Sequence, residues 1–493
     1  MTGAGQGGPW RGDTLAGHAA TRARAPAILT DAETVDWAGF QHRIEAAAAG
    51  FLAHGIGVGT PVAQMATSTP DFLVASFALW RIGAGVLSLD PAEPAAQAAD
   101  LMDRIGARHV VGGTVAGREG QSVPIASDGH ADGALPPPPA PESVCVYRRS
   151  SGTTAGVSKV VASTHRREQE RGQSLAGLMP RTADDRYLAI MTMAHGFSAG
   201  SAQRGIMNGG AVILPGRLVT VDDLVGAARR HRATWTALTP FHLRTLLRTP
   251  RPEPLLPDVR ILVSTAALTA AERIAVMERV SPGLYMSYGA NEIGGIVGCG
   301  PEDLRRHPET VGRTVEGVDA EAVDDADRPV APGEVGELRF RHPDFPAAYA
   351  AAPPETTSRF KDGWFYPGDL GTIDADGFIF LKGRVDDLVN VGGTKIYPSD
   401  VEECLTRHPA VAEAAAFGVA TVLRGERLVA AVVLRGPATA DALRAHCSAA
   451  LGAERAPRAI LVIDELPRTA MAKPDIRALR ALAGARLAQG WDA

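Results

Sequence analysis

The sequence predicts an α/β protein with a separate α+β segment towards its C-terminal end. Between about residues 50 and 300, short apolar runs alternate with amphipathic segments, as expected for parallel strands joined by helices. From about 318 to 382, short strands are separated by Asp, Gly and Pro, which indicates an antiparallel or barrel-like part. Beyond these, helices and strands mix in a compact segment. We therefore predict two domains, 1–385 and 386–493.

The predicted elements follow this order along the chain. Strands are predicted at Val144–Tyr147, Tyr187–Met193, Ala211–Leu214, Thr234–Leu238, Val259–Val263, Leu284–Ser287, Gly336–Phe340, Gly377–Leu381, Leu428–Leu434 and Ile460–Ile463. Helices are predicted at Val221–His231, Ala270–Val280 and Thr439–Leu451. Two pairs stand at capping-box spacing, Thr269 with Glu272 and Ser399 with Glu402, and each predicts a helix start. The proline-rich segments Pro136–Pro141 and Ala347–Pro354 predict loops or linkers.

Charge and composition exclude several classes of partner. The 493 residues carry 50 basic and 55 acidic side chains, a formal net charge of −5. Nucleic acids and anionic membranes select for a clustered basic excess, so neither is expected as a partner. The apolar stretch Phe72–Trp80 is far shorter than the about 20 residues that span a bilayer. The four cysteines are scattered and residues 1–11 lack the apolar core of a signal peptide, so we expect a cytoplasmic protein.

Lysine is rare in this chain. The 50 basic residues include only five lysines, at positions 159, 361, 382, 395 and 473. A codon bias towards arginine is the simplest explanation of the ratio. Three of the five, Lys159, Lys395 and Lys473, nevertheless lie within motifs that could carry chemistry.

The densest polar motif is Ser-Ser-Gly-Thr-Thr-Ala-Gly-Val-Ser-Lys at 150–159, directly after a predicted strand. Small residues let a backbone approach a polyphosphate, and hydroxyls, N–H groups and a lysine supply donors and charge. A Walker A loop is excluded, because three residues separate Gly152 from Gly156 and Val160 follows Lys159. A flexible surface loop is the alternative interpretation of this segment taken alone.

This motif resembles the phosphate loop of the AMP-forming acyl and aryl ligases, the ANL superfamily. Further segments resemble family motifs in the same order: Met193–Phe197, Tyr288–Glu292, Gly336–Leu338, Tyr366–Gly371, Gly383–Asp387, Gly392–Lys395 and Leu466–Lys473. Together they cover nearly the whole chain. The resemblance implies a large N-terminal domain of doubly wound sheets with a small barrel-like part, followed by a small mobile C-terminal α+β domain.

The resemblance also implies ATP and Mg²⁺ as cofactors. The implied nucleotide-binding residues are Ser151, Gly152, Thr153, Thr154, Gly156, Lys159, Thr265, Ala266, Tyr288, Gly289, Asn291, Asp369 and Arg384. Tyr288 would stack on adenine, and Asp369 and Arg384 would contact the ribose. Glu292, with Thr154, would ligate Mg²⁺, because this hard cation prefers oxygen ligands.

Three residues are implied as catalytic: Lys473, Glu292 and His195. The Lys473 ammonium would contact both the substrate carboxylate and the α-phosphate. A compact point charge can bridge two oxyanions, whereas a guanidinium imposes a planar fork, so arginine is a poor substitute. Asp386 falls at the implied hinge, and Gly392, Gly393 and Lys395 are implied to line a channel for the acyl acceptor.

The implied acid-binding residues are His195, Phe197, Ser264, Gly289, Ile293 and Gly294. The end of the phosphate motif and residues 160–165 resemble the dihydroxybenzoate and salicylate subgroup of aryl-acid ligases. Gly196 stands where those enzymes carry an asparagine that reads a 2-hydroxyl. We therefore expect an aryl or arylacrylic acid other than plain salicylate or dihydroxybenzoate. A packed core histidine is the alternative for His195.

The predicted reaction is activation of a carboxylic acid as acyl-AMP with release of pyrophosphate, then transfer to a thiol. The thiol would belong to CoA or to the phosphopantetheine of a separate carrier protein. Two alternatives stay open. In the first, the adenylate is captured by an amine, or another oxyacid is activated on the same scaffold. In the second, the chain binds nucleotide without catalysis, as departures at Thr153, Ala155 and Ser158 would allow.

Overall fold

The computed structural model describes residues 11–126, 135–154, 157–216, 218–249, 254–264, 268–346, 349–350, 359–391, 394–421, 425–468 and 474–488. The chain forms two compact units. Unit 1 comprises 1–319 and 341–364, and unit 2 comprises 320–340 and 365–493. Residues 365–385 thus group with the C-terminal residues, whereas the sequence suggested a boundary between 385 and 386; that boundary stays a prediction.

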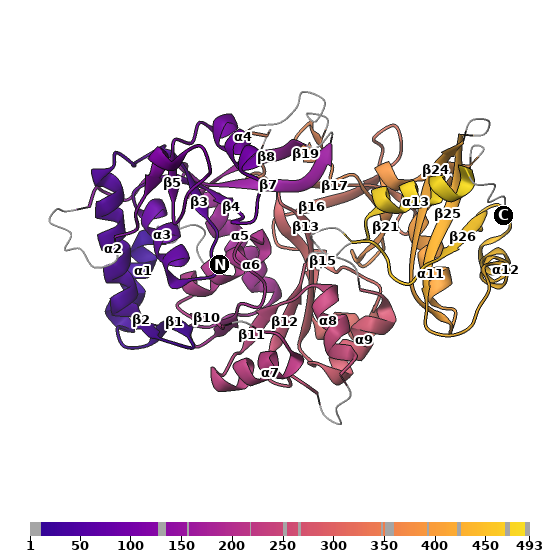
Figure 1. The fold of residues 1–493 in the computed structure, drawn as a ribbon, viewed down its shortest axis with the longest axis horizontal. Helices are drawn as coiled ribbons and strands as arrows, with labels where there is room; N and C mark the ends of the chain where they lie inside the picture. Colours follow the sequence, from indigo (N-terminus) through magenta and orange to yellow (C-terminus); the bar gives the residue numbers. More distant parts are fainter. Residues whose placement is uncertain are drawn as a thin grey trace. The chain divides into compact units, whose positions relative to one another are not determined.

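A nine-stranded sheet forms the centre of unit 1 (Figure 1). Its inner strands run parallel, with antiparallel additions at the edges. In spatial order the strands are β15 (Arg313–Thr314), β14 (Gly294–Cys299), β13 (Leu284–Ala290), β12 (Arg260–Val263), β11 (Trp235–Ala237), β9 (Arg186–Leu188), β10 (Ala211–Leu214), β1 (Pro26–Thr30) and β2 (Thr34–Asp36). The parallel centre confirms the expectation drawn from the alternating apolar runs.

A second, six-stranded sheet lies in the N-terminal part of unit 1. Its spatial order is β6 (Ser122–Val123), β5 (His109–Val111), β3 (Pro61–Met65), β4 (Gly85–Leu89), β7 (Val144–Thr154) and β8 (Val157–Thr164). All neighbours are parallel except the last pair, which forms an antiparallel hairpin.

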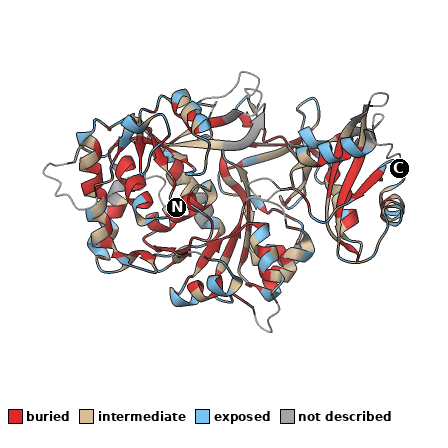
Figure 2. Ribbon diagram, in the orientation of Figure 1, coloured by how far each residue is buried: buried red, intermediate tan, exposed pale blue. Residues whose placement is uncertain are grey.

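Helices cover these sheets. They are α1 (Arg11–Thr21), α2 (Trp37–Ala53), α3 (Pro70–Arg81), α4 (Ala95–Ile105), α5 (His165–Leu178), α6 (Gly196–Met207), α7 (Val221–Arg230), α8 (Pro240–Leu247), α9 (Ala270–Arg279) and α10 (Pro301–Arg306), with the 3₁₀ turn η1 (Glu119–Gln121). Buried residues follow the strands and the inward helix faces (Figure 2). Helices α2 and α3 share one core cluster, in which the rings of Phe40 and Phe77 meet edge to face.

Unit 2 contains a mainly antiparallel sheet and an α+β part. The first is a six-stranded sheet, which includes β16 (Asp319–Val323), β17 (Gly336–Arg341), β20 (Asp369–Ile373) and β21 (Ile379–Arg384) together with the two short strands named next. Short strands β18 (Phe360–Lys361) and β19 (Trp364–Phe365) precede β20 in the chain. The second part comprises η3 (Val385–Asp387), β22 (Val389–Val391), β23 (Thr394–Ile396), α11 (Pro398–Thr406), β24 (Val411–Thr421), β25 (Gly425–Leu434), α12 (Ala440–Leu451), β26 (Ala459–Val462) and α13 (Ile476–Ala488).

One predicted capping box is confirmed and one is wrong. Thr269 is the N-cap of α9. Its hydroxyl oxygen accepts a hydrogen bond from the N–H of Glu272, and the Glu272 carboxylate accepts one from the N–H of Thr269. Helix α11 instead begins at Pro398, with Tyr397 as its N-cap. The Ser399 hydroxyl donates to the carbonyl of Lys382, and Glu402 accepts from the N–H of Ala416, so both side chains serve tertiary contacts.

Strand Tyr187–Met193 was predicted too long, because β9 ends at Leu188. Beyond it the chain turns towards His195, whose side chain caps α6. Strand β7 is longer than predicted and extends through much of the polar motif to Thr154.

The four cysteines are buried thiols that form no disulfide: Cys145, Cys299, Cys404 and Cys447. Burial raises the pKa of the Cys299 and Cys447 thiols to about 12.

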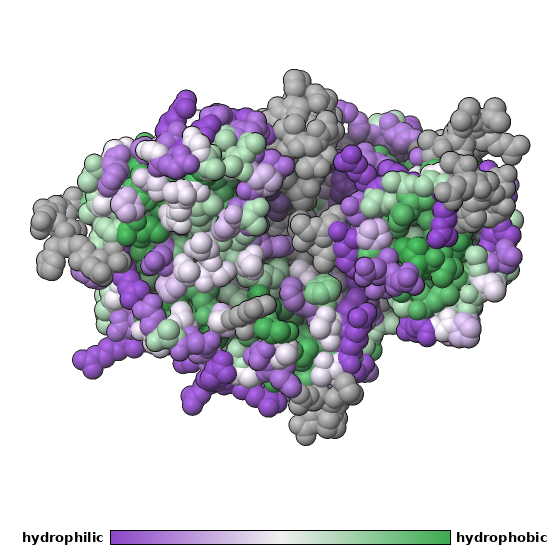
Figure 3. All heavy atoms as spheres, viewed as in Figure 1, coloured by the Kyte–Doolittle hydropathy of each residue, from purple (hydrophilic) through white to green (hydrophobic). Residues whose placement is uncertain are grey.

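Polar and weakly apolar residues cover much of the face shown in Figure 3. Among the residues that the structure describes, no helix has both the length and the apolar character that a bilayer crossing requires.

Candidate functional site

The predicted phosphate motif is a β-hairpin along most of its length. In β7 and β8, Arg149 pairs with Val160, Thr153 with Ser158 and Thr154 with Val157. The register shifts between Arg149 and Thr153, so extra residues of β7 are accommodated there. The backbone of Ser151, Gly152, Thr153 and Thr154 is therefore extended, and Gly156 lies outside the described residues.

Three residues from separate segments of unit 1 meet beside this hairpin: Lys159, Tyr349 and Glu292. Lys159 is only 5% exposed, and its Nζ lies 5.5 Å from the centre of the Tyr349 ring. The Tyr349 hydroxyl donates a hydrogen bond of 2.9 Å to Oε1 of Glu292. Burial, and then the charge of Glu292, raise the pKa of Tyr349, which keeps its proton on the hydroxyl.

The motif Tyr288–Glu292 is anchored to two other elements. The side-chain amide of Asn291 donates 2.7 Å to the carbonyl of Arg149 in β7. The Arg167 guanidinium, on α5, donates to the backbone carbonyl of Glu292. These two bonds hold Asn291 and Glu292 against the base of the hairpin and against α5, so the motif Tyr288–Glu292 lies beside the phosphate motif in unit 1.

Close backbone packing explains the glycines of this segment. A methyl group at Gly289 would lie 1.7 Å from the carbonyl oxygen of Gly294, so no other residue fits there without a backbone shift. Gly294 has φ +89°, a conformation that side chains other than glycine rarely adopt. Tyr288 is half-buried in β13, and Ile293 is 2% exposed.

His195 caps the first turn of α6. Its Nδ1 accepts a hydrogen bond of 3.3 Å from the N–H of Phe197, which leaves Nε2 as the protonated nitrogen of the neutral ring. Burial lowers the pKa of His195, so the ring is neutral at neutral pH. Phe197 packs partly buried against the main core, and Ser264 is half-buried at the end of β12. Thr265 and Ala266 lie outside the described residues.

The donor set fits a nucleotide-associated Mg²⁺ better than a preformed metal cage. Glu292 is 8% exposed, and its carboxylate keeps acceptor capacity beyond the bond from Tyr349. The described part of the chain contains no cluster of three or more His, Cys, Asp or Glu side chains that could hold a metal. One carboxylate completed by phosphate oxygens and waters is how Mg²⁺ is commonly bound with nucleotides.

In unit 2, Asp369 and Arg384 pair directly. They lie opposite each other in β20 and β21, and Nη1 of Arg384 donates 2.9 Å to Oδ1 of Asp369. A second bond of 3.1 Å runs from Nη2 to the carbonyl of Pro367. The two predicted ribose residues are therefore adjacent. Asp386 follows in the exposed turn η3.

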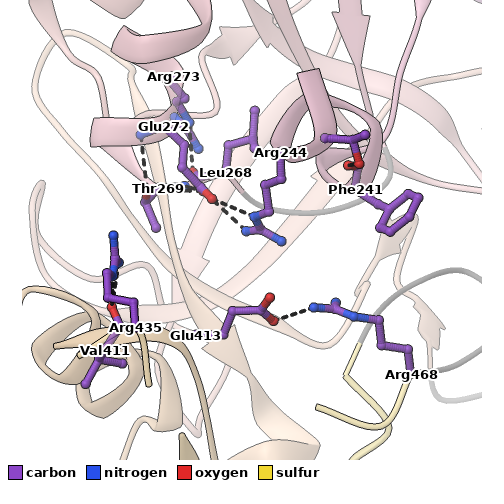
Figure 4. A network of polar contacts seen from close by, with 11 residues as sticks. Phe241, Arg244, Leu268, Thr269, Glu272, Arg273, Val411, Glu413, Arg435 and Arg468 are labelled. Atoms are coloured by element: carbon purple, nitrogen blue, oxygen red, sulfur yellow. Dashed lines mark hydrogen bonds and ion pairs between the residues drawn. The ribbon is translucent and has the colours of Figure 1, made fainter. Parts of the chain in front are cut away.

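The other predicted residues of unit 2 are described in part. Strands β22 and β23 pair antiparallel, with Val391 opposite Thr394 and Asn390 opposite Lys395. Gly392, Gly393 and Lys473 lie outside the described residues. Arg468 and Pro474, on either side of 469–473, pair as an antiparallel bridge. Arg468 also forms an ion pair with Glu413 of β24, and the two side chains point toward one another in Figure 4.

Tyr349 was not predicted from the sequence. It lies in the segment Ala347–Pro354, for which the sequence predicts a loop or linker. Its single aromatic ring was the only available signal. The arginines of α5 were also missed, because charged residues on a helix usually face solvent.

Comparison with known proteins identifies the family. Residues 15–349 match the family model described as AMP-binding enzyme, and 400–473 match the AMP-binding enzyme C-terminal domain. The chain belongs to the AMP-binding enzyme family. The predicted superfamily of AMP-forming ligases and its nucleotide are thereby confirmed, whereas the aryl-acid subgroup stays a prediction.

Relatives of this AMP-binding enzyme differ in their named acids. Sulfoacetate–CoA ligase of Cupriavidus necator is 34% identical over 345 residues, which cover 68% of this chain and 67% of that protein. Triostin synthetase I of Streptomyces triostinicus is 30% identical over an alignment of 512 positions, covering 96% and 94% of the two chains. The matches to two fatty-acid–CoA ligases cover only 54% and 35% of the length of those proteins.

Solved structures confirm the predicted α/β fold with a large N-terminal and a smaller C-terminal part. O-succinylbenzoate coenzyme A synthetase of Bacillus subtilis, in complex with ATP and magnesium ion, superposes with a TM-score of 0.81 at 24% identity. The match covers 93% of this chain and 97% of that chain.

Proposed function

We propose that this AMP-binding enzyme activates a carboxylic acid with ATP and Mg²⁺ as acyl-AMP and transfers the acyl group to a thiol. The arrangement of Lys159, Tyr349 and Glu292 supports this best. It places a buried cation and a hydrogen-bonded carboxylate beside the polar hairpin. Such a site suits phosphate oxygens on one side and a phosphate-bound divalent cation on the other.

In the first half-reaction, a carboxylate oxygen attacks the α-phosphorus and the bond to the β-phosphate oxygen breaks, so pyrophosphate leaves. Glu292 would hold Mg²⁺, which neutralises phosphate charge, and the hairpin at 150–159 would donate to the β- and γ-phosphates. Lys473 would contact the attacking carboxylate and the α-phosphate. His195, neutral because of its burial, lines the acid site without adding a second positive charge.

Nucleoside contacts are assigned to both units. Tyr288 would stack on adenine, with Thr265 and Ala266 on its other face. Asp369 would accept from the ribose hydroxyls and Arg384 would hold Asp369 in place, as their 2.9 Å bond supports.

In the second half-reaction, the thiol sulfur attacks the acyl carbon, the bond to the AMP oxygen breaks and the thiol proton is lost. Rotation about Asp386 would bring Gly392, Gly393 and Lys395 to the acceptor channel. CoA and a carrier-protein phosphopantetheine share the reactive thiol that this step needs. An aryl or arylacrylic acid is the proposed substrate class, on the resemblance of residues around His195 to aryl-acid ligases.

Acid-dependent exchange of labelled pyrophosphate into ATP tests the first half-reaction directly. We expect exchange with at least one acid from a panel of aromatic, arylacrylic and aliphatic acids, and its loss in Glu292→Gln. CoA, a phosphopantetheinylated carrier or an amine is then added to identify the acceptor. ATP binding without exchange for every acid would support a nucleotide-binding protein without catalysis and would refute the proposal.

A further inference from the structure

Three arginines in the interior of unit 1 lie near the predicted acid site. Arg171 is on α5, Arg204 is on α6, and Arg181 precedes β9. A methyl group at Gly294 would lie 2.6 Å from Nε of Arg171, and one at Gly200 would lie 3.0 Å from Nη1 of Arg204. We call Arg171, Arg181 and Arg204 the buried arginine row.

Two members of the buried arginine row lie next to residues that are predicted to bind the acid substrate. Gly294 is one of them, and α6, which carries Arg204, begins directly after His195. Nη2 of Arg204 donates 3.3 Å to Ser201 on the same helix. The guanidinium of Arg181 lies 4.1 Å from the centre of the Trp235 ring, at the start of β11.

Two members of the row lack acceptors for buried donors. None of the three guanidinium nitrogens of Arg181, all of them buried, has a hydrogen-bond partner among the described residues. Nη1 of Arg171 also has no hydrogen-bond partner there, although it forms an ion pair of 3.6 Å with Oε1 of Glu168. The indole Nε1 of Trp235 is a further buried donor without an acceptor in the described part of the chain.

The neighbouring acids are already engaged. Glu168 accepts from Nε of Arg148 at 3.0 Å and from the Ser163 hydroxyl at 2.6 Å. Asp185, the carboxylate near Arg181, is paired with Arg260 and accepts 2.7 Å from Thr234. The interior therefore contains more cations than these carboxylates neutralise.

This excess carries a free-energy cost. Burial, and then the charge of Arg204, lower the pKa of Arg181 to about 9. Burial also lowers the pKa of Arg171. A buried charge without a hydrogen-bond acceptor destabilises the folded chain, whereas a guanidinium facing a planar or tetrahedral oxyanion gains bidentate bonds. Arg167 and Arg148 differ, because each is held by a protein acceptor.

We propose that the buried arginine row binds a second anionic group, a carboxylate or sulfonate, on the acid that this enzyme activates. The inference rests on the proposed function and narrows its substrate to dianionic acids. The reacting carboxylate goes to the adenylation site, and the second anion supplies the acceptors that Arg171 and Arg181 lack.

Matched acids test this inference. Pyrophosphate exchange is measured with pentanoate, glutarate and 4-sulfobutanoate, with benzoate, isophthalate, terephthalate and 3-sulfobenzoate, and with dicarboxylates of increasing length. At least one dianionic acid should exceed its monoanionic counterpart in kcat/KM by about tenfold or more. The carboxylate and sulfonate arms distinguish the two kinds of anion. Equal or better use of every monoanionic counterpart would overturn the inference and leave the proposed function standing.

Arginine variants test whether the preference for dianionic acids comes from the buried arginine row. Arg204→Met and Arg181→Met should each reduce the dianion-to-monoanion ratio of kcat/KM by about tenfold or more. Arg306→Met, an exposed arginine on α10 paired with Glu302, is the control and should leave the ratio unchanged. Retention of the ratio in both row variants would overturn the inference.

Stability and binding provide readouts that do not need turnover. Arg181→Met should raise the melting temperature, because it removes a buried charge whose donors have no acceptor in the described part of the chain. A marked fall would mean that Arg181 is structural and would overturn its role. The preferred dianion without ATP should raise the melting temperature of the wild type but not of Arg204→Met. A dianion-induced rise in the wild-type melting temperature, without pyrophosphate exchange for any acid, would support anion binding by the buried arginine row and would refute the proposed function.

Discussion

Removal of one hydroxyl group tests the assignment of Glu292. In Tyr349→Phe, the Glu292 carboxylate loses the 2.9 Å hydrogen bond that orients it, while the aromatic ring near Lys159 remains. A hydrogen bond to a charged group contributes about 1.5–3 kcal/mol. At about 2 °C per kcal/mol for a large domain, the melting temperature should fall by about 3–6 °C.

The effect on metal use is more specific. A residue that orients a metal ligand typically contributes about 10- to 100-fold to metal affinity or activity. The Mg²⁺ concentration for half-maximal pyrophosphate exchange should therefore rise by about tenfold in Tyr349→Phe. Exchange is measured across a Mg²⁺ titration at saturating ATP and acid.

Tyr285→Phe is the matched control. It removes a hydroxyl from the same unit, and the structure describes no hydrogen bond to that hydroxyl. Its Mg²⁺ titration should follow that of the wild type. An unchanged Mg²⁺ requirement in Tyr349→Phe would refute the orienting role, and a lower requirement would show that Tyr349 competes with the metal for Glu292.

Three further predictions concern unit 2. Lys473→Arg and Lys473→Ala should each lower adenylate formation by about 10²- to 10³-fold in pyrophosphate exchange, and near wild-type exchange would remove Lys473 from the reaction. Asp386→Pro should retain exchange but impair thioester formation, so equal loss of both half-reactions would refute the hinge. Burial raises the pKa of Glu402 from 4.5 to about 7, so its contribution to stability is complete below about pH 4.5 and is lost as the pH rises through 7. The melting temperature should fall between pH 5 and 8.5, and Glu402→Gln should flatten that fall; an equal slope in both proteins would contradict the burial of this carboxyl.

The sequence predicted the fold class and most strands and helices because their signals are local. Apolar runs mark the parallel strands, and the pair Thr269 and Glu272 marks the start of α9 correctly. Ser399 and Glu402 have the same spacing, yet long-range partners at Lys382 and Ala416 take up their side chains. Spacing cannot distinguish these two cases.

The candidate site shows the same limit. Glu292, Lys159, Asp369 and Arg384 are predicted from motifs. In the structure, Glu292 and Lys159 both contact Tyr349, and Asp369 pairs with Arg384. Tyr349 could not be found, because its contact with Glu292 joins residues 57 positions apart. The unpaired donors of Arg171 and Arg181 likewise emerge only when burial is known, since their letters resemble those of exposed arginines elsewhere in the chain.

Because all four cysteines are buried, the protein's own thiols should contribute little signal to an assay that detects thiols. Thiolates are the reactive form, and thiols whose pKa is about 12, such as those of Cys299 and Cys447, are almost fully protonated at neutral pH. The folded protein should therefore react slowly with chromogenic disulfides. Consumption of a free thiol acceptor can then be followed continuously by its sulfhydryl colour, with little signal from the enzyme and little loss to mixed disulfides.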